Sequence, residues 1–271
     1  MDLIEIVFLF SVCIIMSAGV GALCSDVFQL TPAIGCAVFT LIVVAVSFAG
    51  LSGMVTVFSA TVPILVFVTL VFGIYCLMRN GIVIPTSPPL TVNPLLRFWP
   101  VAAILFTCYN VFGSIAILSP LGSHVRSTRS VVLGIIFGAV ILLLVAFSVL
   151  ISISAVGTVH EELPMLTLAF TLGRPLGWLY GVLLLFAMFG TCLSCLVAFV
   201  RSLGEKCPFL KKRRITFHII AAIIIYLCSL LGFGDLISVI YPVFGYISSI
   251  FIVILMFRCF KHTKSEHFSA K

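Results

Sequence analysis

The sequence predicts an all-α protein, a polytopic membrane helical bundle of about eight transmembrane helices. Of its 271 residues, 62% are hydrophobic and 8% are charged, and the mean hydropathy is +1.36. Soluble domains carry about 25% charged residues, so this chain lacks the polar surface that would cover a soluble core. The apolar residues also gather into runs of about 20, the length of a helix that crosses a bilayer.

Eight apolar runs make up one integral membrane domain, residues 1–271. Inside lipid, every backbone N–H and C=O must be paired within its own segment, which favours helices over open strands. The predicted spans are residues 3–23, 32–51, 54–77, 99–118, 131–156, 176–200, 215–231 and 236–257. Residues 80–94 are rich in proline and predict an extended connection, whereas residues 166–170 predict a short surface helix.

The basic residues predict the orientation of the bundle. If residue 1 is cytoplasmic, 12 of the 15 basic residues lie in cytoplasmic segments and three lie outside. Cytoplasmic loops of membrane proteins carry such an excess of Lys and Arg. Both termini are therefore expected in the cytoplasm, with residues 211–214 (KKRR) as the strongest anchor and the plasma membrane as the location.

Ten cysteines are scattered through the apolar runs, where they are expected to act as small packing residues. Cys192 and Cys195 form a C-x-x-C pattern, but no nearby histidine or second C-x-x-C pattern accompanies it. Helix packing is therefore expected for this pair rather than metal binding or redox chemistry. The composition also excludes nucleic-acid binders and disulfide-stapled secreted domains.

Ionisable residues are nearly absent from the middle of the spans. Glu5 and His218 lie near span ends, where interfacial placement is expected. The sequence contains no paired carboxylates, no nucleophile–base set and no phosphate loop. We therefore expect no enzyme and no resident cofactor or metal, and any site must use neutral polar groups.

The fourth span carries the unusual polar cluster of the chain. Its middle holds five residues that are polar or conformationally permissive: Thr107, Tyr109, Asn110, Gly113 and Ser114. Transporters place interrupted helices at the midplane, where half-helix ends meet substrate and ions. The alternative is a continuous helix whose polar residues bond to neighbouring helices. The composition leaves both alternatives open.

Small residues and prolines mark other spans. Two G-x-x-x-G pairs, Gly134 with Gly138 and Gly177 with Gly181, predict close helix approach. Pro63 and Pro242 fall inside spans and predict kinks. The hydroxyls of four further span residues are expected to face a cavity or, as is more common, to bond backbone carbonyls; they are Ser152, Ser154, Thr191 and Ser194.

Three stretches carry a family resemblance: YN at residues 109–110 with LSPLG at 118–122, ELPML at 162–166, and GFGDLISVIYPVFGY at 232–246. In this order they resemble the YkvI-type membrane proteins of bacteria. That family belongs to the amino acid–polyamine–organocation transporter superfamily, which has the LeuT fold. The order and spacing cover nearly the whole chain, although no single motif is decisive.

The resemblance implies that the eight spans correspond to helices three to ten of a ten-helix core. The fourth span then takes the place of the interrupted sixth helix, with Thr107, Tyr109, Asn110, Gly113 and Ser114 in the substrate site. Thr191 and Ser194 match a cation site that commonly uses hydroxyls of the eighth helix. The coupling ion would be Na⁺ or H⁺. The first two core helices are expected to be missing.

Two functions therefore stand beside each other. The first is a secondary transporter of a small, amino-acid-like organic solute that works by alternating access and is N-terminally truncated. The second is a non-transporting membrane partner, a receptor-like subunit or an inactive shortened paralogue. In the first case a second chain or a homo-oligomer is the expected partner, because it would supply the missing helices.

Overall fold

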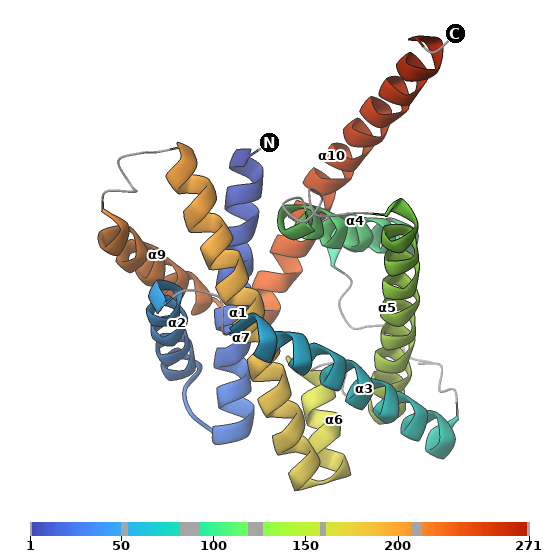
Figure 1. Ribbon diagram of the computed structural model, residues 1–271. Coiled ribbons are helices and arrows are strands. Elements are labelled where there is room, and N and C mark those ends of the chain that lie inside the picture. The colour runs from blue at the N-terminus through green and yellow to red at the C-terminus, as the bar shows by residue number, and fades with distance from the viewer. Residues whose placement is uncertain are drawn as a thin grey trace.

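The computed structural model describes residues 2–49, 54–81, 93–118, 127–157, 161–206 and 213–269. All regular structure within these ranges is helical (Figure 1), which confirms the predicted all-α class. The elements in chain order are α1 (Asp2–Phe28), α2 (Pro32–Ala49), α3 (Met54–Asn80), η1 (Pro94–Leu96), α4 (Trp99–Leu118), α5 (Thr128–Val156), α6 (Pro164–Leu172), α7 (Arg174–Lys206), α9 (Arg214–Ser229) and α10 (Phe233–Ser269).

Each predicted span corresponds to one helix. In the described part of the chain, α1, α3, α5, α7 and α10 contain stretches long and apolar enough to cross a membrane. The apolar stretches of α2, α4 and α9 are shorter, at 10–17 residues, so their crossing remains a prediction. Residues 211–212 of the basic cluster and residues 119–122 of the first family stretch lie outside the described ranges.

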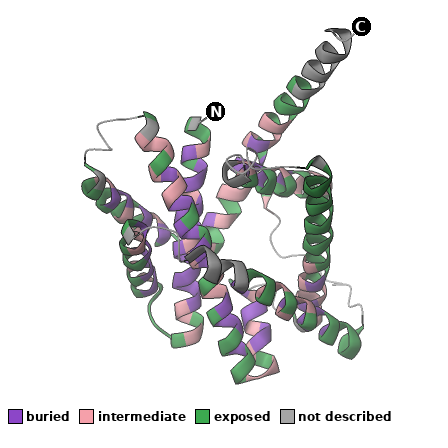
Figure 2. Ribbon diagram, viewed as in Figure 1, coloured by how far each residue is buried: buried purple, intermediate pink, exposed green. Residues whose placement is uncertain are grey.

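Helix α1 forms the centre of the bundle and packs on α7, α2, α9 and α10 (Figure 1). Of its most apolar 18-residue stretch, 78% is buried, and Ile15 and Leu9 are among the largest fully buried side chains. Figure 2 shows this buried column running through the molecule. A helix with apolar residues all round is expected in such a position, because every face meets another helix or lipid.

Small residues let the helices approach closely. Helix association in lipid depends on packing rather than on hydrophobic burial, so glycine at a crossing point matters more than in water. A Cβ on Gly73 of α3 would lie 2.7 Å from the Cα of Ser148 of α5, and one on Gly245 of α10 would lie 3.1 Å from the carbonyl oxygen of Leu105 of α4. Alanine at either position would therefore push two backbones apart.

The two G-x-x-x-G pairs have different surroundings. A Cβ on Gly177 would lie 2.6 Å from the ring atom Cε1 of Phe170, so this pair packs α7 on α6 as predicted. Nothing lies within 4 Å of a Cβ on Gly134 or Gly138. The prediction of close helix approach is therefore wrong for Gly134 and Gly138 within the described chain, because α5 packs on α3 and α6 through other residues.

The predicted surface helix near residues 166–170 is longer and lies deeper than expected. It is α6, Pro164–Leu172, and the helix begins with proline, whose missing N–H costs nothing at a first turn. Leu166, Leu168 and Ala169 are at most 1% exposed. The apolar face of α6 packs against α7, which explains why the helix is buried rather than at the surface.

Candidate functional site

Helix α4 is continuous from Trp99 to Leu118. Of the two alternatives, the interrupted helix is therefore wrong. The polar side chains bond to the carbonyl one turn back in their own helix, so the helix needs no break and no neighbouring helix to satisfy them. The hydrogen bonds run from Thr107 Oγ1 to Ala103 O (2.9 Å), from Asn110 Nδ2 to Phe106 O (2.8 Å) and from Ser114 Oγ to Asn110 O (2.8 Å).

The five predicted substrate residues divide between two faces of α4. Thr107, Asn110 and Ser114 are exposed, at spacings of three and four residues that place them on one face. We call this set the α4 polar stripe. Tyr109 is buried and Gly113 is half-buried, and both face the bundle. The structure therefore does not bring all five together around one point.

Tyr109 lies where α4, α1 and α10 meet. Its ring centroid is 4.4 Å from that of Tyr241 on α10 and 5.0 Å from that of Phe8 on α1. A Cβ on Gly113 would lie 3.1 Å from the Phe8 ring, so this glycine allows the ring to approach α4 closely. A buried tyrosine whose ring packs against aromatic rings of two other helices is well suited to fix helix positions.

Helix α7 carries the predicted cation residues on an exposed face. Thr191 and Ser194 are both exposed, and Thr191 Oγ1 donates to Ala187 O at 2.9 Å. Between residues 187 and 206, every exposed residue whose side chain is described is polar; the set is Thr191, Ser194, Arg201 and Lys206. We call Thr191 and Ser194 the α7 hydroxyl pair. A lipid-facing surface would instead carry large apolar side chains.

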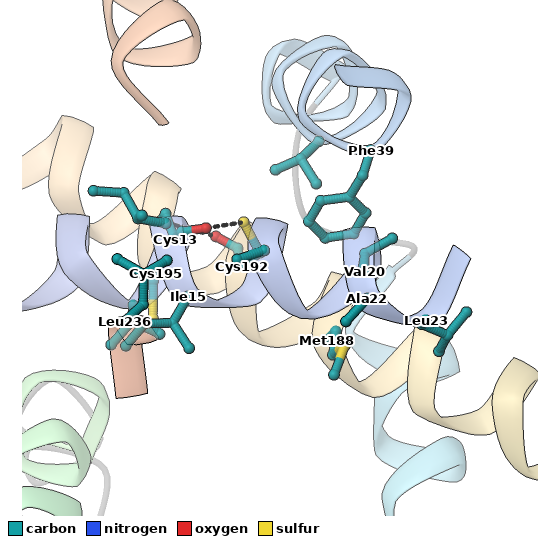
Figure 3. Packing of buried hydrophobic residues seen from close by; sticks show 14 of the residues in the cluster. Cys13, Ile15, Val20, Ala22, Leu23, Phe39, Met188, Cys192, Cys195 and Leu236 are labelled. Atoms are coloured by element: carbon teal, nitrogen blue, oxygen red, sulfur yellow. Dashed lines mark hydrogen bonds between the residues drawn. The ribbon is translucent and has the colours of Figure 1, made fainter. Parts of the chain in front are cut away.

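The residues between these two polar surfaces are buried. Cys195, next to Ser194 on α7, is buried, as is Tyr109 on α4. Figure 3 shows Cys195 beside Ile15 of α1 and Leu236 of α10. The α4 polar stripe and the α7 hydroxyl pair lie on two helices that both contact α1, on exposed faces next to the buried residues Tyr109 and Cys195. They form our candidate site.

The buried cysteines lie where α1 crosses α7, with reciprocal weak hydrogen bonds (Figure 3). Cys13 Sγ donates to Cys192 O at 3.6 Å, and Cys192 Sγ donates to Cys13 O at 3.8 Å. This agrees with the predicted packing role for Cys192 and Cys195, both of which are buried in the core. Among the described residues, no group of three or more His, Cys, Asp or Glu is placed to hold a metal ion.

Several buried polar groups differ from their predicted roles or were missed. His218 is 1% exposed, with its ring centroid 4.4 Å from that of Phe48 on α2, so it belongs to a helix contact. Ser152 was expected to face a cavity or, as is more common, to bond a backbone carbonyl; its hydroxyl and that of Ser248 have no hydrogen-bond partner among the described residues. The packing of the half-buried Tyr241 against Tyr109 was not predicted, and the only sequence signal for it is the position of Tyr241 inside the third family stretch.

These features define a polytopic α-helical membrane protein that holds neutral polar side chains on two of its helices. The chain is similar to a Bacillus subtilis (strain 168) protein named "Uncharacterized membrane protein YkvI", with 25% identity over 247 residues, 89% of this chain and 68% of the relative. This similarity agrees with the resemblance to YkvI-type membrane proteins that the three sequence stretches carry. No family model and no solved structure matches.

Proposed function

We propose that this protein is a secondary transporter of a small, amino-acid-like organic solute. The α4 polar stripe carries the proposal: three exposed polar side chains follow one face of a helix that is otherwise apolar. Such a face is costly in contact with lipid, so it is expected to line water, solute or another helix. The superfamily resemblance supports transport by alternating access on the LeuT plan.

The residues of the candidate site have separate roles in this proposal. Asn110 offers an amide that can both donate to and accept from a zwitterionic solute. Thr107 and Ser114 add hydroxyls one turn on either side. Tyr109 and Gly113 set the position of α4 against α1, because they face the bundle. The α7 hydroxyl pair would supply oxygen ligands to a coupling Na⁺; H⁺ is the alternative coupling ion.

Uptake by the purified chain in proteoliposomes tests the proposal. A mixture of labelled amino acids is offered under an imposed Na⁺ or H⁺ gradient. Asn110→Leu should reduce uptake at least about tenfold, which corresponds to the loss of one hydrogen bond of about 1.4 kcal/mol. Asn80→Leu is the matched control, because Asn80 is an exposed asparagine at the end of α3. Unchanged uptake by Asn110→Leu would contradict the site.

A second candidate is a non-transporting membrane partner. The α7 face favours it, because Ala187, Thr191, Ser194 and Ala198 are small residues on the surface of one helix, and such a face suits a helix of a second chain. That second chain, or a second copy, would complete the bundle. Solute binding or uptake by a purified monomer would contradict this candidate. Association with a membrane partner, detected by crosslinking through Ser194→Cys, would support it.

We also propose that the protein lies in the plasma membrane with both termini in the cytoplasm. The asymmetry of the basic residues supports this orientation. Reporter fusions at the two termini test this orientation. A phosphatase fusion that is active at either end, and so exposed outside the cytoplasm, would contradict it.

A further inference from the structure

Pro242 interrupts the hydrogen-bond ladder of α10. It lies inside the helix and is among the largest fully buried residues. Because proline has no backbone N–H, it cannot donate to the carbonyl four residues earlier, which is that of Ser238. In a membrane helix such a freed carbonyl needs another donor, since a carbonyl without a partner is costly in lipid.

Asn93 supplies this donor from far away in the sequence. Its Nδ2 donates to the carbonyl oxygen of Ser238 at 2.7 Å. On the other side of the same amide, Oδ1 accepts from the backbone N–H of Leu95 at 3.0 Å. This second bond caps η1, the short helix that leads into α4. One side chain therefore joins the break in α10 to the start of α4.

Two further contacts fix α10 to α4 on the other side of Pro242. The Tyr246 hydroxyl donates to the carbonyl oxygen of Leu95 at 2.9 Å. One residue earlier, Gly245 lets α10 approach the Leu105 backbone. The segment entering α4 is thus bonded to α10 four residues before the proline and four residues after it.

We propose that Asn93 is the latch of a hinge at Pro242. With the latch closed, the Ser238 carbonyl is bonded, and α4, η1 and α10 form one body. With the latch open, the carbonyl loses its donor and α10 can flex at the break. Tyr241, whose ring packs against that of Tyr109, directly precedes Pro242, so flexing there would displace the inner face of the candidate site. Only this last consequence rests on the proposed function.

A double-mutant cycle tests the latch in the full-length protein in detergent. Asn93→Ala should lower the Tm by several degrees, roughly the effect of losing one or two hydrogen bonds. Pro242→Ala restores a backbone N–H for the Ser238 carbonyl. In that background Asn93→Ala should lower the Tm by less than half as much. Equal losses in both backgrounds would overturn the proposal.

Two further variants serve as controls for the double-mutant cycle. Asn93→Asp keeps the acceptor for Leu95 N–H but loses the donor to Ser238 and sets a carboxylate against that carbonyl, so it should lower the Tm clearly below that of the wild type. A wild-type Tm for Asn93→Asp would overturn the proposal even if Pro242→Ala does not fold. Asn80→Ala is the matched control, because Asn80 Nδ2 contacts the carbonyl of Ala155 at 3.5 Å, far from Pro242; its effect should be the same in both backgrounds.

Hydrogen exchange shows whether the latch controls motion. Asn93→Ala should speed amide exchange in residues 233–241 of α10, and Pro242→Ala should reverse this change. Exchange in α7 should stay constant in all variants. Unchanged exchange in residues 233–241 would overturn the hinge. No solute is needed, so this result is independent of the uptake assay and separates a failed latch from a failed transport proposal.

Discussion

Two exposed surfaces of this molecule have opposite chemistry. Every residue of α5 from 129 to 144 is exposed, and most are large and apolar, such as Phe137 and Leu142. Only 6% of its most apolar stretch is buried (Figure 2). On α7, the described exposed side chains between 187 and 206 are all polar. The two helices have similar length, but α5 exposes mainly large apolar side chains, whereas this part of α7 exposes polar ones.

Exposure alone therefore does not identify a site in a membrane protein. Lipid covers the α5 surface at no cost, because its side chains are as apolar as acyl chains. The α7 hydroxyl pair and the α4 polar stripe gain nothing from lipid, so their surfaces are expected to face water, solute or another helix. The difference in residue type, and not in exposed area, separates the two environments.

The largest expected effect comes from an arginine at the centre of α5. Leu142 is 70% exposed, so Leu142→Arg should place a charge in the hydrocarbon core, at a cost of about 2.5–3.5 kcal/mol. Membrane-inserted protein should fall markedly, as measured by membrane fractionation and fluorescence size-exclusion chromatography. Ser194→Arg on α7 is the control and should reduce insertion less. Equal losses would mean that α7 also faces lipid.

The next effect concerns the attachment of α5 to the bundle. Gly73→Ala should force α3 and α5 apart, because its Cβ would lie 2.7 Å from the Ser148 Cα, and overpacking costs about 1–3 kcal/mol. Ser148→Ala removes only the 2.6 Å hydrogen bond to Thr69 O, so its cost should be about 0.5–1.5 kcal/mol. Thermal unfolding in detergent ranks the two variants. The reverse ranking would contradict the packing described.

A smaller expected effect concerns how readily a cysteine introduced on α7 or on α5 reacts with a water-soluble reagent. Thr191→Cys should react with a water-soluble thiosulfonate reagent at least about tenfold faster than Leu142→Cys, because a thiol in lipid forms little of the reactive thiolate. The rates are measured in membranes from cells that produce each variant, with the unsubstituted chain as background. Slow reaction at residue 191 would indicate that a helix, rather than water, covers the α7 hydroxyl pair.

The helices were predictable because 20-residue apolar runs carry their own signal. The polar residues of α4 were also visible in the sequence, but of the two alternatives that they left open, the interrupted helix was wrong. Thr107, Asn110 and Ser114 satisfy themselves on the preceding turn, an outcome that composition cannot distinguish from a break. Their separation from Tyr109 follows from helical phase. The bond between Asn93 and Ser238 was not predictable, because it joins residues 145 positions apart, and nothing local indicates such a pairing.

The smallest expected effect lies on α5 itself and decides whether lipid is its only neighbour. Nothing lies within 4 Å of a Cβ on Gly134, so Gly134→Ala should change the free energy of unfolding by less than about 1 kcal/mol. Any gain in stability would come from the higher helix propensity of alanine. Gly134→Leu should be equally neutral, because a larger side chain would simply extend into lipid. Both are measured by thermal unfolding and by oligomeric state in detergent. If Leu lowers the Tm or dissociates an oligomer while Ala does not, a helix must pack against Gly134 and Gly138. The α5 surface would then be an interface, and its contrast with α7 would lie between two kinds of protein contact.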